Sequence, residues 1–548
     1  MRIGLGLGIG VWAAMASVGL AQGPDTTKTA SVAAAGTGTG MPRVVEKDGR
    51  WALMVDGAPY VMLGMQLNNS SAWPGVFDQV WPAVDRLHAN TIEAPVYWEQ
   101  MEPVEGRFDF SVVDALLASA RAHKVHLVLL WFGTWKNGSP HYVPEWMKAD
   151  PAKYPMLVDA KGMVRDTMSP YGAATLEADT AAFRALMRHL KAADARHTVL
   201  MVQVENEINQ YGSSRDYSAE AVKAYAGAVP EELVKALHTQ EGTWEQVFGA
   251  EASDTFQTWS IARYVEQVVK AGKAEDGLPM YLNHSLGDAG RPAANGRLSG
   301  ADQMNHALDI WKATAPSLDL IAPDIYMTDF VRYSRILDIY GRKDNALFVP
   351  ETTNSALGAK FLFAALGRGA IGWSPFGLDL TGYSNAPLGA PLVDEKLIDL
   401  FALNYKLLGP MAREIARLNF EGNVQAVAED PAVHTQSLEF GPWTATVAYG
   451  LKQFGRATNA PGNADPVGRA LVAQLGPDEF LVTGIDARVD FRPTDAASNK
   501  HREWVRVEEG QYVDGRWKFV RIWNGDQTDY GLNFTEGVQV LRVRVGEF

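Results

Sequence analysis

Eight short apolar segments, which alternate with helix-period segments between about residues 60 and 380, constrain the fold of this chain most strongly. Parallel strands covered by helices give this pattern, because such strands are buried on both faces. The strand candidates are YVMLGM (60–65), TIEAPVYW (91–98), VHLVLLWF (125–132), VLMVQVEN (199–206), PMYLNHS (279–285), LDLIAPDIY (318–326), ALFVPETT (346–353) and GAIGWSPF (369–376). Eight strands over this length predict a (β/α)8 TIM barrel rather than an open doubly wound sheet.

The barrel is expected to occupy residues 42–410 and to be followed by a smaller all-β sandwich domain at 411–548. Amphipathic segments fit the barrel's helices at 75–88, 111–124, 179–193 and 354–366. Asp48-Gly49 and Asp56-Gly57 predict hairpin turns before the barrel, because both dipeptides tolerate positive φ. After residue 410, alternating segments separated by turn residues such as Asp514-Gly515 predict the sandwich.

The N-terminal segment has the features of an export signal. Residues 1–21 combine a basic Arg2, an apolar stretch and small residues before an expected cleavage after Ala21, which indicates a signal peptide. Residues 22–41 are small and polar without a period, so we expect a disordered linker. The protein is therefore expected to be periplasmic or secreted, with no membrane attachment after cleavage.

Composition narrows the function classes. A net charge of −14 argues against a nucleic-acid partner, whose phosphates require a basic surface. The chain has no cysteine, and its 11 histidines form no HExxH motif or zinc-ligand spacing, so we expect no metal. No glycine-rich phosphate loop follows a strand, so we expect no cofactor. The sequence does not indicate an oligomeric state.

Two glutamates stand where strands end. In VLMVQVENE (199–207), alternation places Gln203, Glu205 and Glu207 on one side of the strand, which in a barrel is the axis. Glu351 likewise ends the strand in ALFVPETT. The C-terminal strand ends of a TM barrel form the mouth that carries the active site. Glu207 and Glu351 are therefore expected to face each other there.

Two carboxyl groups about 5 Å apart are what retaining glycoside hydrolysis requires. One is the nucleophile, and the other is an acid that later serves as base. At this separation the ionisation of one carboxyl raises the pKa of the other, so that the protonated group can donate to the leaving oxygen. Glu207 and Glu351 are therefore the candidate catalytic residues.

At QVENE (203–207), the chain resembles the β-galactosidases of glycoside hydrolase family 35, in the clan that carries Asn-Glu after strand four and a second Glu after strand seven. The stretches PVYWEQMEPVEGRFDFS (95–111) and QTWSIARYVEQVVKAGKAEDGLPMYLN (257–283) are also similar to that family, in its bacterial branch. The resemblance implies that Glu207 is the acid/base, that Glu351 is the nucleophile and that Asn206 holds the sugar 2-hydroxyl.

Further substrate-binding candidates lie at other strand ends. Tyr326 would donate to the nucleophile and keep it ionised, and the clan often has a Trp at the position of Trp373, under the sugar. The remaining candidates are Tyr97 and Glu99 at the end of strand two, Trp131 and Trp135 at the end of strand three, and Asn283 at the end of strand five.

The main hypothesis is a secreted retaining exo-β-galactosidase. Its substrates would be galactose-terminated oligosaccharides or side chains of plant cell-wall polysaccharides. A β-glucanase or mannanase of the same clan is the first alternative, because it would keep the barrel and both glutamates. A non-catalytic carbohydrate-binding protein is the second alternative. A metallohydrolase fits the sequence less well than these.

Overall fold

A computed structural model describes residues 40–208, 213–287, 300–454, 460–495, 500–535 and 538–548 of the 548-residue chain. The expected signal peptide, and all of the expected linker except its last two residues, lie outside these described residues. Among the described residues, no helix combines the length and the apolar character needed to cross a membrane.

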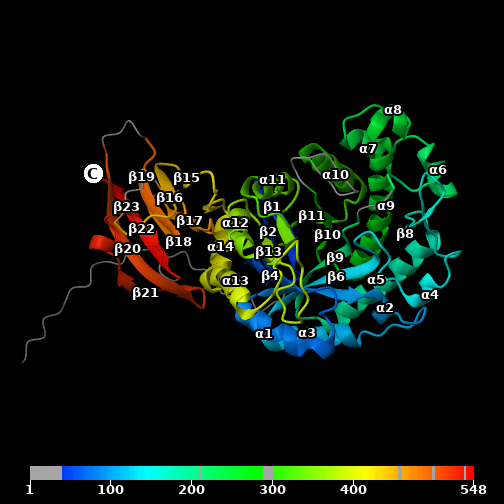
Figure 1. Ribbon diagram of the computed structural model, residues 1–548, viewed down its shortest axis with the longest axis horizontal. Helices are drawn as coiled ribbons and strands as arrows, with labels where there is room; N and C mark the ends of the chain where they lie inside the picture. The colour runs from blue at the N-terminus through cyan, green and yellow to red at the C-terminus, as the bar shows by residue number, and fades with distance from the viewer. Residues whose placement is uncertain (1–39, 209–212, 288–299, 455–459, 496–499, 536–537) are drawn as a thin grey trace, which may run out of the picture. The chain divides into compact units, whose positions relative to one another are not determined.

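Eight parallel strands form a closed barrel, as the sequence predicts (Figure 1). Its strands adjoin in the order β4, β5, β6, β9, β10, β11, β12 and β13, and β13 closes onto β4. Their bounds are β4 Met62–Gln66, β5 Thr91–Tyr97, β6 His126–Lys136, β9 Val199–Asn206, β10 Met280–Ser285, β11 Leu320–Ile325, β12 Phe348–Thr352 and β13 Gly372–Pro375. All eight strand candidates are confirmed.

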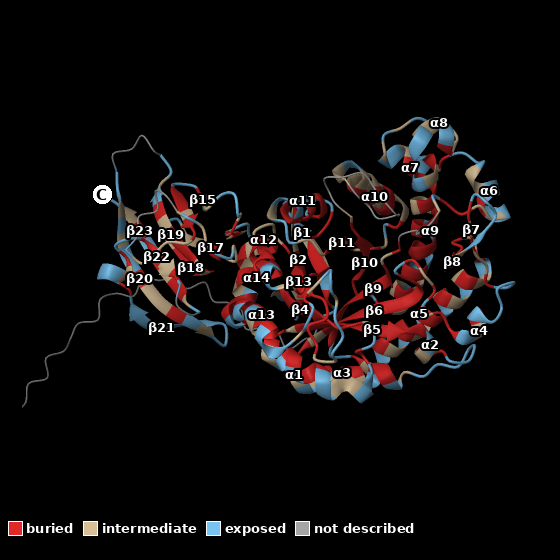
Figure 2. Cartoon of the chain, in the orientation of Figure 1, coloured by how far each residue is buried: buried red, intermediate tan, exposed pale blue. Residues whose placement is uncertain are grey.

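Helices surround the barrel, and the strands between them are almost entirely buried (Figure 2). The α-helices are α1 Phe77–Leu87, α2 Trp98–Met101, α3 Ser111–His123, α4 Glu145–Lys148, α5 Ala173–Ala193, α6 Ala219–Tyr225, α7 Glu231–Ala236, α8 Trp244–Phe248, α9 Ala252–Glu275, α10 Ala301–Thr314, α11 Phe330–Tyr340, α12 Phe361–Leu366, α13 Glu395–Leu408 and α14 Ala412–Phe420. Short 3-10 turns are η1 Pro74–Val76, η2 Gly249–Glu251, η3 Ala356–Gly358, η4 Gly409–Met411 and η6 Gly525–Gln527.

The helix α3 illustrates why the periodicity predicted these elements. Its buried residues, Val112, Val113, Leu116, Leu117 and Ala120, recur at intervals of three or four positions and form one apolar stripe, which packs against the barrel. Two expected helices have different bounds. The helix α5 begins at Ala173, six residues before the expected start, and residues 354–366 form η3 and the short α12 instead of one helix.

A three-stranded antiparallel sheet precedes the barrel and consists of β1 Arg43–Lys47, β2 Arg50–Val55 and β3 Ala58–Tyr60. Asp48-Gly49 and Asp56-Gly57 connect these strands, and all four residues have positive φ. The predicted hairpin turns are therefore confirmed. A two-stranded sheet, β7 Met156–Val158 and β8 Val164–Met168, lies in the long connection between β6 and α5.

Two antiparallel sheets form the C-terminal domain. The larger has the order β14, β17, β18, β23, β20 and β21, and the smaller has the order β15, β16, β19 and β22. Side chains from both sheets form one apolar cluster, so the domain is a sandwich. The bounds are β14 Val424–Ala428, β15 Thr435–Phe440, β16 Trp443–Ala448, β17 Arg469–Gly476, β18 Glu479–Ile485, β19 Ala487–Pro493, β20 Arg502–Val513, β21 Arg516–Ile522, β22 Leu532–Phe534 and β23 Val540–Glu547.

The strand β9 departs from the expected alternation at its C-terminal end. Glu205 and Glu207 both have left-handed backbone conformations, with φ of 62° and 45°. Opposite them, the pairing of β6 with β9 shifts register between Trp131 and Lys136. The two glutamates therefore do not share one side of a regular strand, and the prediction that Glu205 faces the axis is wrong.

Candidate active site

Three carboxylates from three strands converge at the C-terminal end of the barrel. Glu207 follows β9, Asp324 lies on β11 and Glu351 lies on β12. Each contributes an oxygen atom to a group in which all such atoms lie within 4.8 Å of one another. The structure thus brings Glu207 and Glu351 together, although they lie far apart in the sequence.

Glu351 is buried and receives two hydrogen bonds. The Tyr326 hydroxyl donates to its Oε1 at 2.5 Å, and the Gln66 Nε2 donates to its Oε2 at 2.8 Å. Burial, followed by the charge of Glu207, raises the pKa of Glu351. The Lys136 ammonium and the two hydrogen bonds act in the opposite direction, because they favour the carboxylate.

Asn206 and Glu207 are held by side chains from neighbouring strands. The Lys136 ammonium donates to Asn206 Oδ1 at 2.8 Å. The Asn206 amide nitrogen is buried and has no hydrogen-bond partner among the described residues. The backbone N–H of Glu207 donates to Asn283 Oδ1 at 3.0 Å, which fixes the strand end that carries the Glu207 carboxyl group. Glu207 itself is only partly buried.

Asp324 completes the group and was not predicted. It is buried, and the Asn283 Nδ2 donates to its Oδ2 at 2.6 Å. Burial, then the charges of Glu351 and Glu207, raise the pKa of Asp324 well above its ordinary value. Asn283 therefore touches both Glu207 and Asp324 and links the two strand ends.

The structure separates Glu99, Trp131 and Trp135 from the three carboxylates. The Glu99 side chain, on α2, is exposed and pairs with Lys148 at 3.4 Å. The Trp131 indole donates at 2.9 Å to the buried Asp179 of α5. The Trp135 indole donates to the Met168 carbonyl oxygen and packs against Tyr264 of α9. Both tryptophans therefore occupy the layer between β6 and the helices.

Trp373 also packs outward. It is fully buried, its indole N–H donates to the Tyr333 hydroxyl of α11 at 3.0 Å, and its ring stacks near Phe401 of α13. The expectation that Trp373 lies under the sugar placed it on the wrong face of β13. A tryptophan in a strand buried on both faces has no sequence feature that indicates its side.

Tyr97 lies in an aromatic group at the end of β5. Its ring stacks between Trp73 and Tyr142, at centroid distances of 5.1 and 5.5 Å, and its hydroxyl accepts a hydrogen bond from the Ala72 N–H. Trp73 is 38% exposed, and it presents an apolar ring beside the barrel mouth. The sequence analysis did not identify Trp73.

Gln66, Lys136 and Asp324 are the site residues that the sequence analysis missed. Each lies within or at the end of a barrel strand, so position at a strand end could have indicated Gln66 and Lys136. Asp324 has the same parity as Tyr326 in the sixth barrel strand, and an acid within an apolar strand is costly unless it is used. Parity combined with burial cost was therefore the available signal for Asp324.

Glu205 lies behind the site. Trp135 donates its backbone N–H to Glu205 Oε2 at 2.7 Å, and the Glu205 carboxyl meets Asp179 of α5. Burial, then the charge of Asp179, raises the pKa of Glu205 well above its ordinary value. Two adjacent buried carboxyl groups repel each other when both are ionised, which favours a proton between them. Glu205 is therefore part of the packing between β9 and the helices.

The electrostatics of the site favour acid–base chemistry over cation binding. Lys136 supplies a positive charge that acts on both Asp324 and Glu351. We therefore assign no metal or cofactor to the three carboxylates.

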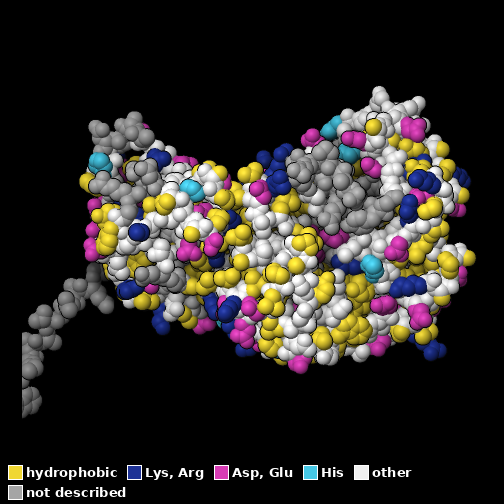
Figure 3. All heavy atoms as spheres, viewed as in Figure 1, with side chains coloured by type: hydrophobic (Ala, Val, Ile, Leu, Met, Phe, Trp, Pro, Cys, Tyr) yellow, Lys and Arg dark blue, Asp and Glu magenta, His cyan; other side chains and the backbone are white. Residues whose placement is uncertain are grey.

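On the face of the molecule drawn in Figure 3, basic and acidic side chains are interspersed over the surface.

Two family models match parts of the chain. The glycoside hydrolase family 42 model, described as beta-galactosidase, matches residues 74–273, which run from the start of η1 into α9. A domain of unknown function, DUF5597, matches residues 401–535, which include most of the sandwich. Over residues 74–273, the chain is therefore similar to the β-galactosidases of glycoside hydrolase family 42.

A curated β-galactosidase from Xanthomonas manihotis is 27% identical over 179 residues, which are 32% of this chain and 28% of that protein. Among solved structures, the chain is similar to β-galactosidases from the psychrophilic Marinomonas ef1 (14% identity, TM-score 0.48, 65% of this chain and 61% of that one) and from Rahnella sp. R3 (17%, 0.47, 68% and 59%). The chain spans between about a quarter and three fifths of the length of these relatives.

The expected membership of family 35 is not confirmed, because the matching model is that of family 42. The residues that carried the resemblance explain the difference. Asn206-Glu207 and Glu351 are features of the whole clan, and they distinguish the clan from other barrels without separating its families.

Proposed function

We propose that the protein is a retaining exo-β-galactosidase that removes terminal β-linked galactose from oligosaccharides or from side chains of plant cell-wall polysaccharides. Glu351 is the nucleophile and Glu207 is the acid/base. We further propose that the protein is exported to the periplasm or secreted. The family 42 match over residues 74–273 supports the sugar, and the apolar N-terminal segment supports export.

The convergence of Glu207 and Glu351 is the observation that carries the proposal. One oxygen atom of each glutamate lies within 4.8 Å of one from the other. Retaining glycosidases hold their carboxyl groups about 5 to 5.5 Å apart, whereas inverting enzymes hold them about 6.5 to 9.5 Å apart to admit a water molecule. The observed spacing therefore supports double displacement over single displacement.

The surroundings of Glu351 suit a nucleophile. Two hydrogen bonds, from Tyr326 and Gln66, are directed at its two oxygen atoms. They favour the carboxylate against the cost of burial, and they fix the orientation of the attacking oxygen. Attack on the anomeric carbon would form a glycosyl ester at Glu351 while Glu207 protonates the leaving oxygen.

Asn206 suits the role of a ligand for the sugar. Its side-chain oxygen is held by Lys136, so the amide nitrogen remains as a buried donor without a partner among the described residues. A buried donor of this kind costs free energy until it is satisfied. A sugar hydroxyl that accepts this hydrogen bond would recover that cost on binding.

Exo action rests on the connection between β9 and β10. The connection between β9 and β10 carries α6 to α9, and an insertion of this size could close one side of the mouth to form a pocket. A β-glucanase or mannanase with an open cleft would use the same two glutamates. A non-catalytic carbohydrate-binding protein would bind sugars without turnover.

A panel of nitrophenyl glycosides tests the proposal. We expect hydrolysis of the β-galactoside with a kcat/KM at least about tenfold above those for the β-glucoside and β-mannoside, and release of β-galactose as the first product by NMR. Preference for glucose or mannose would redirect the sugar assignment. Absence of turnover on every glycoside, with retained sugar binding, would contradict the proposal that the protein is an enzyme.

A further inference from the structure

We infer that Asp324 is a positioning residue that shares one proton with Glu207 and thereby keeps the acid/base supplied with a proton during the reaction. The inference rests on the proposed function and extends it to a third carboxyl group. Asp324 acts through Glu207, since the proton passes to the leaving group from the Glu207 carboxyl.

The contacts of Asp324 place it against Glu207. One oxygen atom of its carboxyl group lies within 4.8 Å of one from Glu207. Two carboxyl groups can form a hydrogen bond with each other only when one of them is protonated. Asn283 fixes the geometry, because its amide donates to Asp324 Oδ2 and its oxygen accepts from the Glu207 backbone N–H. One side chain thus holds both the Asp324 carboxyl group and the backbone of Glu207.

The second carboxylate oxygen of Asp324 also favours a shared proton. Among the described residues, Asp324 Oδ1 is buried and lacks an N–H or O–H partner. A buried carboxylate oxygen without a donor costs free energy, and a proton shared with Glu207 removes that cost. Burial and the two neighbouring carboxylates also raise the pKa of Asp324 well above its ordinary value, which favours the protonated form.

The charged and titratable groups around Asp324 are consistent with one shared proton. Lys136 is the cation that acts on it, and it opposes the two glutamates. Three tyrosines from β10, the end of β11 and α11 also face it and are neutral, since burial raises the pKa of each well above its ordinary value. Among the described residues, these groups are Glu207, Glu351, Lys136, Tyr281, Tyr326 and Tyr340.

His284 adds no charge nearby. Its Nδ1 lies 2.9 Å from the Tyr340 hydroxyl oxygen, and burial lowers the pKa of His284 to about 3. It is therefore neutral over the working range. The charge balance at Asp324 depends on the three carboxylates and on Lys136.

The proton count closes over both halves of the reaction. Before attack, Glu351 is a carboxylate, and Glu207 and Asp324 together hold one proton. When Glu351 forms the ester it loses its charge, while Glu207 gives the proton to the glycosidic oxygen and the pair becomes doubly negative. In the second half, water gives a proton to the pair and its oxygen to the anomeric carbon, and Glu351 leaves as a carboxylate. The net charge of the three groups stays the same beside Lys136.

The pH profile of Asp324→Asn tests the inference. Asparagine keeps the shape and a donor toward Glu207 but cannot ionise. In the wild type, the alkaline limb of kcat/KM reports the second ionisation of the Glu207–Asp324 pair, which the first negative charge delays. We expect the variant's alkaline limb to move to lower pH by about one unit or more. On aryl galactosides whose leaving groups need no protonation, the variant should lose much less activity at neutral pH.

A matched variant separates this role from general damage. Asp319→Asn removes a carboxylate just before β11, where Asp319 accepts from Lys273 and from the Met280 N–H at 2.7 Å each. We expect its pH profile to match the wild type. An Asp324→Asn profile with an unmoved alkaline limb and only a lower plateau would overturn the inference, because a purely structural role would give that result.

Infrared difference spectroscopy makes the test independent of turnover. At neutral pH, the wild type minus Asp324→Asn spectrum should contain a protonated-carboxyl band, which disappears on titration to alkaline pH. No such band would overturn the shared proton even if the enzyme hydrolyses galactosides. Conversely, if the band is present but no glycoside is hydrolysed, the proposed function is contradicted and the shared proton is supported.

Discussion

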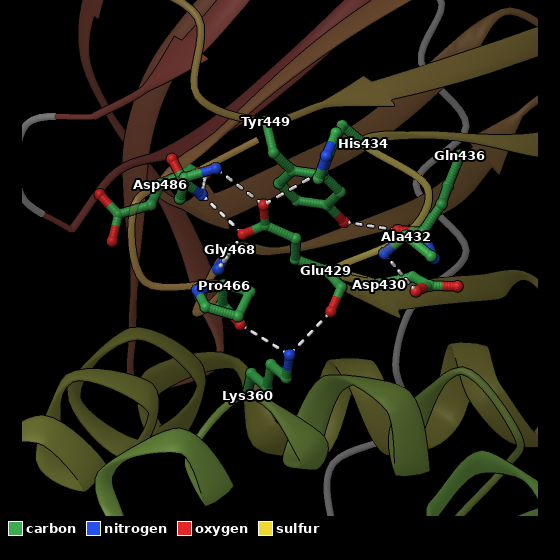
Figure 4. A network of polar contacts seen from close by, with 11 residues as sticks. Lys360, Glu429, Asp430, Ala432, His434, Gln436, Tyr449, Pro466, Gly468 and Asp486 are labelled. Carbon is green, nitrogen blue, oxygen red and sulfur yellow. Dashed lines mark hydrogen bonds and ion pairs between the residues drawn. The ribbon is translucent and has the colours of Figure 1, made fainter. Parts of the chain in front are cut away.

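Two buried carboxylate clusters in this molecule have opposite hydrogen-bond balances. In the barrel mouth, Glu207, Asp324 and Glu351 meet with like charges, and donor-poor oxygen atoms remain. Near the sandwich, Glu429 is fully buried but accepts from Asn463 through both the backbone and the side chain, and from the Gly468 N–H, at 2.8 to 3.0 Å (Figure 4).

The cation beside each cluster differs in the same way. Lys360 is buried and donates to the carbonyl oxygens of Glu429 and Pro466 at 2.8 and 2.6 Å (Figure 4). Burial lowers the pKa of Lys360 to about 8. Lys136 in the mouth instead holds an amide oxygen of Asn206, and it faces carboxylates that remain in excess. A carboxylate whose hydrogen bonds are satisfied stabilises the fold, whereas a cluster with an excess of negative charge can perform chemistry.

Substitution of the two site glutamates should break this comparison most strongly. Glu351→Ala should lower kcat by about 10⁴-fold or more, because the covalent route is lost, and added azide should restore activity with inverted configuration. Glu207→Ala should cost about 10² to 10⁴-fold on substrates with poor leaving groups and far less on those with good ones. Steady-state kinetics and product NMR measure both effects. Rescue of Glu351→Ala with retained configuration would contradict the assignment.

Lys360→Met should instead lower the stability of the fold and leave activity unchanged. It removes the ammonium donor from the buried Glu429 carbonyl oxygen and from the part-buried Pro466 carbonyl oxygen, so the free energy of unfolding should fall by about 2 to 4 kcal/mol. The kcat/KM per folded molecule should stay unchanged. Urea unfolding and kinetics measure the two quantities. Lys343→Met, at an exposed lysine, is the control and should change stability by less than about 0.5 kcal/mol. Equal costs for the two variants would remove the contrast between the clusters.

The Glu205–Asp179 pair gives a smaller effect that depends on pH. The folded-state pKa of Glu205 is raised, so the stability from its protonated form is present below the unfolded pKa of about 4.3 and is lost as the pH rises through the folded value. Glu205→Gln stays neutral, and its amide can donate to Asp179. The stability of this variant relative to wild type should therefore be greater at pH 8 than at pH 5, in urea titrations.

Glu177→Gln, on the exposed face of α5, serves as the control for that measurement. Its stability relative to wild type should not change between the two pH values. The same relative stability of Glu205→Gln at pH 5 and pH 8 would show that no shared proton exists behind β9.

Glu99 should give the smallest effect. Its carboxylate is exposed and pairs with Lys148 at 3.4 Å, and such pairs contribute about 0 to 1 kcal/mol. Glu99→Ala should change KM for a galactoside by less than about twofold, because the side chain does not reach the carboxylates. A large rise in KM would return Glu99 to the substrate site that the sequence suggested.

The sequence predicted the strands well because apolar runs and their spacing report burial directly. It also predicted the meeting of Glu207 and Glu351, since strand ends in a barrel must share one mouth. The side of a strand that a residue occupies was harder to predict. Trp373 lies in a strand buried on both faces, where apolar side chains give no indication of direction.

Local backbone conformation explains the error at Glu205. A positive φ at Glu205 and a register shift opposite it break the period of two, and neither feature follows from residue types alone. Asp324 could have been found from parity with Tyr326, but its contact with Glu207 depends on Asn283 from another strand. Tertiary contacts of this kind appear only when the strands are assembled.

Trapping of the covalent intermediate tests the central claim most directly. A 2-deoxy-2-fluoro-galactoside with a good leaving group should inactivate the enzyme, and mass spectrometry of its peptides should find the fluorosugar esterified to Glu351. The label should be absent from Glu351→Gln. A label on Glu207 or Asp324, or steady turnover of galactosides through an inverted product with no label at all, would contradict the account.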